Sequence, residues 1–563
     1  MTQITRRATL QILSALGIGS VAFHKALAVQ IEESQSITAA MIANASWIAE
    51  QELTPEQQEE VAKTVASKLR NISKLRQYAI DADTPLSVSF VPHFFADAKR
   101  SVADLPELDV QFSWREFSSA ESPTLTESEI SFASVRTLGQ MLRSRQVSSF
   151  ELTKLYLSRL NRFNPLLNCV VNLTEEIALA QAKRADDELA TGSDRGPLHG
   201  IPYGAKDIMT VPNLPTTWGV SEYRDTVRQQ TATVVQRMES AGAVLLGKLS
   251  VGTMAWGDEW FGGMTRNPWN PEQGSSGSSA GSACAVAAGM CGFALGTETH
   301  GSIVSPSRRC GVTGLRPTFG RISRAGCMTL GWTLDKIGPI VRYVEDAAAV
   351  FANLLGADGR DPTVVHRPFH WPAHQSTNSW KIGFIPDQLS KAEQECLERL
   401  RAQGAAVVEI ALPTEVPIDP LMDCLSCEAA TMHEELSRNA ADEQVLGKWG
   451  PTFRGGQWIP AVHYLRGLRA RTQLISLMEA TLSKVDVLLG GQDLAHTNLS
   501  GHPSLVVAVS SRETPVGPQP DTIKLTSRLF AEDVLLSVGQ FLQMEIPPTP
   551  AAPPLERFLQ ESE

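Results

Sequence analysis

A glycine- and serine-rich stretch holds the residues of this 563-residue chain that are best suited to chemistry. Ten of its 41 glycines lie between Gly257 and Gly301, and residues 274–282 read Gly-Ser-Ser-Gly-Ser-Ser-Ala-Gly-Ser. An apolar segment of small residues, 283–289, follows at once, which disfavours a flexible linker. We expect a loop whose backbone amides closely approach another group and whose hydroxyls are held in position, fixed by a buried helix.

One interpretation of this loop is the nucleophile elbow of α/β hydrolases. Residues 277–281, Gly-Ser-Ser-Ala-Gly, match its G-x-S-x-G pattern and make Ser279 the nucleophile. That elbow directly follows a strand, whereas residues 267–271, Asn-Pro-Trp-Asn-Pro, predict a loop. The order Ser, acid, His stays open, because downstream candidates are Asp486, Asp493, His496 and His502.

Two further patterns are weaker. Residues 242–248 nearly match the phosphate-binding pattern G-x-x-x-x-G-K, but Leu249 replaces the magnesium-binding Ser or Thr and residues 243–246 predict a strand. Nucleotide binding is therefore disfavoured. Cys424 and Cys427 are a close pair among eight scattered cysteines, with His433 as a third candidate ligand. A fourth ligand at metal spacing is missing, so buried thiols are the favoured interpretation.

Several longer motifs, taken together, resemble the amidase signature family. They are residues 197–207 (Pro-Leu-His-Gly-Ile-Pro-Tyr-Gly-Ala-Lys-Asp), 267–271, 296–303 (Gly-Thr-Glu-Thr-His-Gly-Ser-Ile), 310–321, 334–339 and 498–503. Lys206 lies 72 residues before Ser278, and Ser302 lies 24 residues after it, as in the Ser-Ser-Lys triad of that family. The resemblance spans about residues 130–545 and implies the family's α/β fold, a mixed β-sheet core covered by helices on both faces.

The resemblance also implies an activity: hydrolysis of a carboxamide C–N bond through an acyl-enzyme, with no metal or cofactor. In this family the roles fall on Ser302 as nucleophile, Ser278 as proton bridge on a cis peptide bond, and Lys206 as base. The oxyanion would be bound by the backbone amides of Thr299, His300, Gly301 and Ser302. A lysine has an ordinary pKa of ~10.4, so Lys206 acts as a base only if burial favours its neutral form.

Three positions near the nucleophile depart from the family pattern. His300 replaces the usual glycine, Glu298 replaces an aspartate, and Val304 replaces an arginine that often helps to order this loop. Arg308 and Arg309 are the candidates to supply the missing charge. Because all three triad residues are kept, we expect a working enzyme, with a catalytically inactive binding protein as the alternative.

The elements that must position these residues alternate between helices and short strands, which predicts layered α/β architecture. Capping boxes at Thr54 with Gln57 and at Ser148 with Glu151 predict two helix starts. Further helices are expected at residues 175–189, 233–241 and 345–355, and strands at 243–246, 381–385 and 405–410.

The N-terminus is typical of an export signal. Arg6 and Arg7 precede an apolar stretch, residues 10–23, and residues 26–28, Ala-Leu-Ala, suit cleavage after Ala28. The paired arginines resemble a twin-arginine signal, although Thr9 and Gln11 depart from its pattern. We expect a periplasmic or secreted protein with four parts: the signal 1–28, a mostly helical appended region 29–130, the amidase signature domain 131–545, and a Pro-rich tail 546–563.

Composition and charge limit the classes of partner that the protein can bind. The chain is 42% hydrophobic and 20% charged, as in ordinary globular proteins, with a net charge of −11. The absence of a basic cluster argues against nucleic acid as a partner, and no apolar run is long enough for a stable membrane span. A small-molecule or peptide amide is the expected substrate. The charge and signal argue against the alternative, a cytoplasmic glutamyl-tRNA amidotransferase A-like subunit, and oligomeric state stays open.

Overall fold

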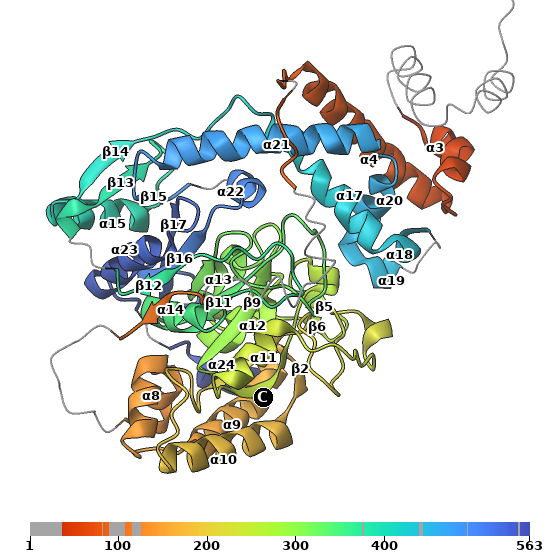
Figure 1. Ribbon diagram of the computed structural model, residues 1–563. Coiled ribbons are helices and arrows are strands. Elements are labelled where there is room, and N and C mark those ends of the chain that lie inside the picture. The colour runs from red at the N-terminus through yellow and green to blue at the C-terminus, as the bar shows by residue number, and fades with distance from the viewer. Residues whose placement is uncertain are drawn as a thin grey trace, which may run out of the picture. The chain divides into compact units, whose positions relative to one another are not determined.

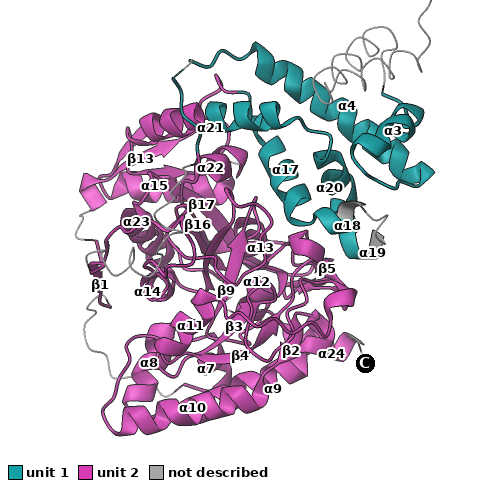
Figure 2. Cartoon of the chain, turned by 45° about the vertical axis from the view of Figure 1, so that its right-hand side comes forward, with its two compact units in different colours: residues 1–87, 417–470 teal, residues 88–416, 471–563 magenta. Residues whose placement is uncertain are grey.

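The computed structural model describes residues 37–81, 83–88, 107–114, 125–373, 377–438, 443–491, 494–549 and 552–562. The expected export signal, residues 1–28, lies outside the described residues. The chain divides into two compact units, which do not follow chain order (Figure 2). The smaller unit contains residues 1–87 and 417–470, and the larger one contains residues 88–416 and 471–563.

The described part of the larger unit is built on a mixed sheet of eleven strands. From edge to edge they are β14 (Ala406–Glu409), β13 (Lys381–Phe384), β15 (Val487–Leu489), β17 (Gln519–Ser527), β16 (Ser504–Arg512), β10 (Thr313–Arg316), β11 (Lys336–Val341), β9 (Phe293–Glu298), β3 (Pro202–Lys206), β4 (Val244–Leu249) and β2 (Val170–Leu173). β3 runs parallel to both of its neighbours, β4 and β9. β9, by contrast, is antiparallel to β11 on its other side. All residues of β3, β4, β9 and β11 are buried, so this part of the sheet is core.

Helices cover this sheet on both faces, which confirms the expected fold class (Figure 1). Those packed directly against its strands include α9 (Ser149–Leu167), α10 (Glu175–Ala190), α12 (Ala280–Ala287), α13 (Val304–Cys310), α14 (Val344–Ala352) and α23 (Glu532–Glu545). α12 is the expected small-residue helix, and all eight of its residues are buried. Its backbone comes so close to its surroundings that a Cβ on Gly281 would lie 2.4 Å from the Cys169 carbonyl oxygen.

Local sequence signals account for several element boundaries. Both capping boxes are formed, with Thr54 opening α4 (Pro55–Gln77) and Ser148 opening α9. The predicted helices at 175–189, 233–241 and 345–355 are α10, α11 (Thr233–Ser240) and α14, and the predicted strands are β4, β13 and β14. Each prediction is confirmed to within a few residues, as expected where caps and periodicity are strong.

Two stretches contain packed elements that the sequence did not predict. Residues 107–114, within the appended region expected to be mostly helical, include β1 (Val110–Phe112), which pairs in parallel with β12 (Phe369–Trp371). The Pro-rich tail ends in α24 (Leu555–Ser562), where Leu555 and Phe558 are buried and Glu556 pairs with Arg162 on α9. In both cases a few apolar side chains find a partner surface that local sequence does not reveal.

The smaller unit is helical and joins the N-terminal segment to residues 417–470. Its described helices include α3 (Ala39–Ala45), α4, α17 (Asp423–Met432) and α20 (Gly450–Gly456). Met41, Ile42, Val61, Val65 and Trp458 form its apolar core. The Lys68 ammonium on α4 lies 2.8 Å from the Asp423 carboxylate, so the pairing is also ionic. No local pattern indicated that residues 417–470 belong with the N-terminal region rather than with the sheet. Across the described residues, no helix is both long and apolar enough to cross a bilayer.

Candidate active site

The site begins with Lys206, the last residue of β3. The side chain is fully buried because β3 lies between β4 and β9 and is covered by α9 and α12. Its ammonium nitrogen lies 2.8 Å from the Ser278 hydroxyl, 2.8 Å from the Thr297 hydroxyl and 3.1 Å from the Ser279 hydroxyl. Burial lowers the pKa of Lys206 to about 7, although Asp335 and Glu298 oppose the shift. A lysine in this setting is neutral in a large fraction of molecules near pH 7.

The glycine- and serine-rich loop places Ser278 against this amine. Ser278 follows a cis peptide bond from Gly277, as the resemblance implied, and is 1% exposed. Gly277 is needed there, because a Cβ would lie 1.8 Å from the Gly257 carbonyl oxygen. The loop runs directly into α12, so the expectation of a closely approached loop held by a buried helix is confirmed.

Ser302 reaches the same place from a second loop, after β9. Its carbonyl oxygen accepts a hydrogen bond from the Ser279 amide at 3.1 Å, which fastens the two loops together. The side chain is half-buried, and its hydroxyl forms no hydrogen bond with a described residue. The structure thus joins the Lys206 and Ser278 side chains directly, whereas Ser302 is tied to their neighbour Ser279 by a backbone hydrogen bond.

The residues expected to bind an oxyanion lie between Glu298 and α13. Thr299 is buried and donates its hydroxyl to Asp335 at 2.6 Å, while the His300 side chain is exposed. Gly301 has φ of 91°, a left-handed conformation that favours glycine. Its carbonyl accepts the Ser305 amide at 2.7 Å and so begins the turn that leads into α13.

The Glu298 carboxylate binds the far end of this loop. One carboxylate oxygen accepts the amides of Ile303 and Val304 at 2.8 and 2.9 Å. The other accepts from Arg316 at 2.8 Å and from Asn498 at 2.9 Å. Burial by itself raises the pKa of Glu298, but Arg316 and Lys336 outweigh it and hold the value at about 2.

The positive charge beside Glu298 therefore comes from Arg316, which was not among the residues predicted to supply it. Arg308 and Arg309 were the expected substitutes for the arginine absent at position 304. Arg309 is exposed and reaches the Gly274 carbonyl at 3.4 Å, whereas Arg316, on β10, is fully buried against Glu298. Arg316 lies within the motif at residues 310–321, but local spacing does not indicate its partner.

A second buried lysine lies one strand away. Lys248, the near match to a phosphate-binding lysine, is on β4, which starts within the strand predicted at residues 243–246 and runs three residues beyond it to Leu249. Its ammonium pairs with Asp207 at 2.7 Å and donates to Thr216 at 3.1 Å. Asp207 also accepts the Thr217 amide at 3.1 Å. The lysine of this near match is thus bound within the protein itself.

The nucleophile-elbow interpretation is not supported by the geometry. The segment before the loop is a short hairpin of β7 (Arg266–Asn267) and β8 (Asn270–Gly274), separate from the main sheet, not the predicted loop. The Ser279 hydroxyl is buried and donates to the Thr297 carbonyl at 3.1 Å. His496 is bonded to the Pro413 carbonyl, and His502 to Ser500 and Glu479. Of the candidate acids, Asp486 accepts the Lys381 amide, and Asp493 lies outside the described residues.

The cysteine pair lies on one helix, α17. Cys424 and Cys427 are free thiols on α17, and the His433 ring stacks on Phe453 with centroids 5.3 Å apart. In the described ranges, no three His, Cys, Asp or Glu side chains are grouped so as to hold a metal ion. The favoured interpretation, buried or incidental thiols, fits this arrangement.

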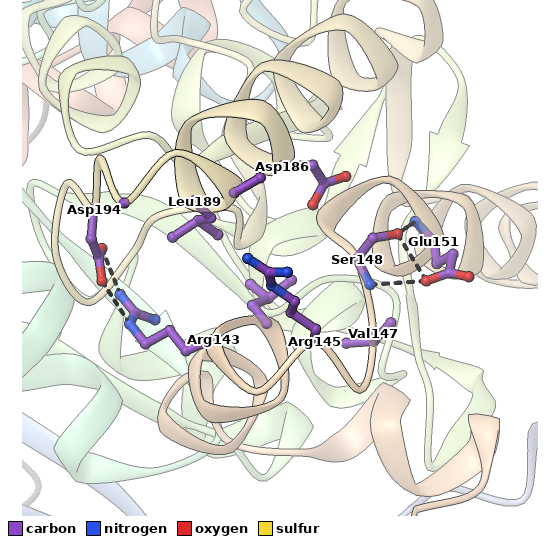
Figure 3. A pocket seen from close by; sticks show the side chains of 11 residues that line it. Arg143, Arg145, Val147, Ser148, Glu151, Asp186, Leu189 and Asp194 are labelled. Carbon is purple, nitrogen blue, oxygen red and sulfur yellow. Dashed lines mark hydrogen bonds and ion pairs between the residues drawn. The ribbon is translucent and has the colours of Figure 1, made fainter.

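A separate surface pocket of about 480 Å³ opens beside the start of α9 (Figure 3). Its polar groups are largely paired with one another. Arg143 binds Asp194 at 2.8 Å, and Glu151 accepts the Ser148 amide at 2.9 Å. Asp186 accepts the amides of Ser149 and Phe150. The residues that line this pocket do not include Lys206, Ser278 or Ser302.

Comparisons with known proteins agree with this arrangement. Residues 151–511 match the amidase family. The putative amidase AmiD of Mycobacterium tuberculosis is 30% identical over 470 residues, covering 76% of this chain and 96% of that protein. The glutamyl-tRNA(Gln) amidotransferase A subunit of Methylococcus capsulatus is 40% identical over 295 residues, 49% of this chain. The match spans only 61% of that protein's length.

A solved structure supports the same assignment. The native peptide amidase of Stenotrophomonas maltophilia has a TM-score of 0.65 and 27% identity, over 73% of this chain and 96% of that one. The resemblance identified from the motifs is thereby confirmed, together with the fold that it implied. With a family match over more than half of its length, the chain belongs to the amidase family.

Proposed function

We propose that this protein hydrolyses a carboxamide through a Ser302–Ser278–Lys206 triad. The observation that carries the proposal is the buried Lys206 amine, bonded to Ser278 at 2.8 Å and with its pKa lowered to about 7. A serine hydroxyl is a weak nucleophile and needs a base whose neutral form is accessible at the working pH. Neutral Lys206 meets that need, and Ser278 is the hydroxyl that can carry the proton to it.

The reaction proceeds in two halves. Ser278 passes its proton to neutral Lys206 and takes the proton of Ser302, whose oxygen attacks the amide carbonyl carbon. The tetrahedral intermediate collapses when the C–N bond breaks, and the leaving amine receives a proton back from Lys206 through Ser278. A water molecule then attacks the Ser302 ester by the same proton path and releases the carboxylic acid. Amide donors of residues 299–302 would stabilise the oxyanion, each typically contributing a factor of ~10² to 10³.

The proposed substrate is a small or peptide amide met outside the cytoplasm. Similarity to a peptide amidase and to a putative amidase supports this class. The export half of the proposal rests on residues 1–28 alone. We expect the mature protein in the periplasmic fraction of a bacterial host to begin at Val29. A double change of Arg6→Lys and Arg7→Lys should keep it in the cytoplasm, and unchanged partitioning would contradict twin-arginine export.

The triad is tested by intact-mass spectrometry after incubation with a fluorophosphonate. We expect one adduct on the wild-type protein and none on Ser302→Ala, with Ser278→Ala reacting far more slowly. Ser279→Ala is the matched control, because it removes a neighbouring hydroxyl that also contacts Lys206 but has no part in the proton path. An adduct mapped to Ser279 would contradict the triad, and a folded protein that forms no adduct would favour a binding role.

A second candidate is an amidotransferase A-like subunit, which the 40% identity over 295 residues favours. Such a subunit is expected to copurify with partner chains from its own organism and to release ammonia from glutamine. A protein that purifies alone and hydrolyses other amides without partners would exclude this candidate. Glutamine hydrolysis that requires a copurified chain would replace the leading proposal.

A further inference from the structure

The loop that carries the proposed nucleophile is closed by the side chain of Glu298. We define the oxyanion loop as residues 299–304. We infer that Glu298 is the positioning residue that sets the shape of this loop, and that Arg316 and Asn498 hold its carboxylate in place. The inference rests on the proposed function, since it assigns a role in the same reaction.

The geometry of the closure is specific. Glu298 stands at the end of β9, immediately before the loop, and one of its carboxylate oxygens accepts the amides of Ile303 and Val304, just beyond Ser302. The side chain of Glu298, its hydrogen bonds to the amides of Ile303 and Val304, and the intervening backbone therefore form a closed ring that contains residues 299–302. Both of these amides are bound to the carboxylate, so the donors left for an oxyanion are those of the enclosed residues. A shift of the carboxylate would move Gly301 and Ser302 together.

The other carboxylate oxygen fixes the orientation of Glu298. It accepts from Arg316 at 2.8 Å and from Asn498 at 2.9 Å, so both oxygens are occupied and rotation is prevented. Asn498 also donates to the Leu494 carbonyl at 3.0 Å. Its own side-chain oxygen is buried with no hydrogen-bond partner among the described residues. The structure thus uses only the donating end of this amide group.

Arg316 is anchored independently of the loop. From β10 it donates to the His502 carbonyl and to the Ser504 hydroxyl, both at 2.7 Å. It therefore presents its charge to Glu298 from a strand of the sheet, whereas Val304, in the loop, is apolar and 1% exposed. The charge expected at position 304 is supplied from outside the loop. The opposite end of the loop has a separate anchor, the bond from Thr299 to Asp335.

The test measures phosphonylation of Ser302 by a fluorophosphonate under saturating conditions, which separates kinact from KI. Oxyanion donors act on the transition state, so misplacing them lowers kinact and leaves KI nearly unchanged. We expect Glu298→Gln to lower kinact about 100-fold and Asn498→Leu about tenfold. Glu298→Asp, which restores a carboxylate one methylene shorter, should recover part of the loss.

Arg308→Met is the matched control, because it removes a half-buried arginine of the same region that makes no contact with Glu298. It should change kinact less than twofold. Circular dichroism and thermal melting establish whether each variant folds. If Glu298→Gln does not fold, the result for Asn498→Leu decides the question.

Unchanged kinact in a folded variant would overturn the inference, as would equal changes in kinact and KI or an equal loss in Arg308→Met. These outcomes differ from failure of the proposed function, in which the wild-type protein itself forms no adduct at Ser302.

Discussion

Two buried lysines on neighbouring strands show how partners decide the chemistry of a side chain. Lys206 on β3 and Lys248 on β4 are both fully buried, and the two strands run parallel and paired. Lys248 lies 2.7 Å from the Asp207 carboxylate, and Lys206 is surrounded by hydroxyls at 2.8 to 3.1 Å. Hydroxyls accept hydrogen bonds but supply no charge to offset burial, so the pKa of Lys206 falls to about 7. A buried amine becomes a candidate base when the carboxylate is absent.

The largest expected effect comes from removing the candidate base. Lys206→Met should lower amide hydrolysis and fluorophosphonate labelling by about 10³- to 10⁴-fold, because no other group takes the proton from Ser278. Its effect on stability should be small, since the change leaves no charge unpaired. The second-order rate of labelling and the thermal midpoint, measured on the same preparation, check both halves. Activity that survives within tenfold would mean that Lys206 is a structural lysine like Lys248.

The opposite outcome is expected for Lys248→Met. This change leaves the Asp207 carboxylate buried without its cation, which should cost about 3–5 kcal/mol in the free energy of unfolding. Labelling per folded molecule should fall far less than in Lys206→Met. Urea titration measures the stability, and the double variant Lys248→Met with Asp207→Asn is the control. If the double variant is no more stable than Lys248→Met alone, the ion pair is not the reason for the loss.

The pH dependence sharpens the comparison further. The reaction needs neutral Lys206, whose pKa is about 7, so kcat/KM should rise with pH and level off above that value. Below it, the rate should fall about tenfold per pH unit, because the neutral fraction falls by that factor. The second-order rate of fluorophosphonate labelling, which needs the same neutral lysine, gives this pH profile when it is measured between pH 5 and 9. A flat profile across pH 7 would argue that Lys206 does not act as the base.

The smallest expected effect belongs to Thr297, whose hydroxyl accepts from Lys206 at 2.8 Å. Thr297→Val removes an acceptor that favours the charged amine, so the pKa of Lys206 should fall further and the acid limb should move to lower pH. The rate at high pH should change only a few-fold, since the proton path through Ser278 is intact. A shift of the limb to higher pH would show that Thr297 stabilises the neutral amine instead.

Sequence reasoning was strongest where a short motif carries its own physical cause. Capping at Thr54 and Ser148, the small-residue helix after the loop and the strand predicted at residues 243–246 all follow from local pattern, and all are present. The spacing of Lys206, Ser278 and Ser302 selected the site, and the structure joins the first two by a hydrogen bond. Thr297 was overlooked, because a threonine on a buried strand has no distinguishing local signal.

The sequence by itself therefore determined the elements that carry strong local signals and the side chains that are equipped for chemistry. Caps, helical periodicity and the need for small residues act over a few positions and can be read locally. Only the tertiary structure decided which charge meets which partner: Arg316 with Glu298, Asp207 with Lys248, and residues 417–470 with the N-terminal helices. Burial strengthens such interactions and sets their pKa values, and burial depends on strands and helices far apart in the chain. The difference between Lys206 as a candidate base and Lys248 as a structural lysine arises from these tertiary contacts.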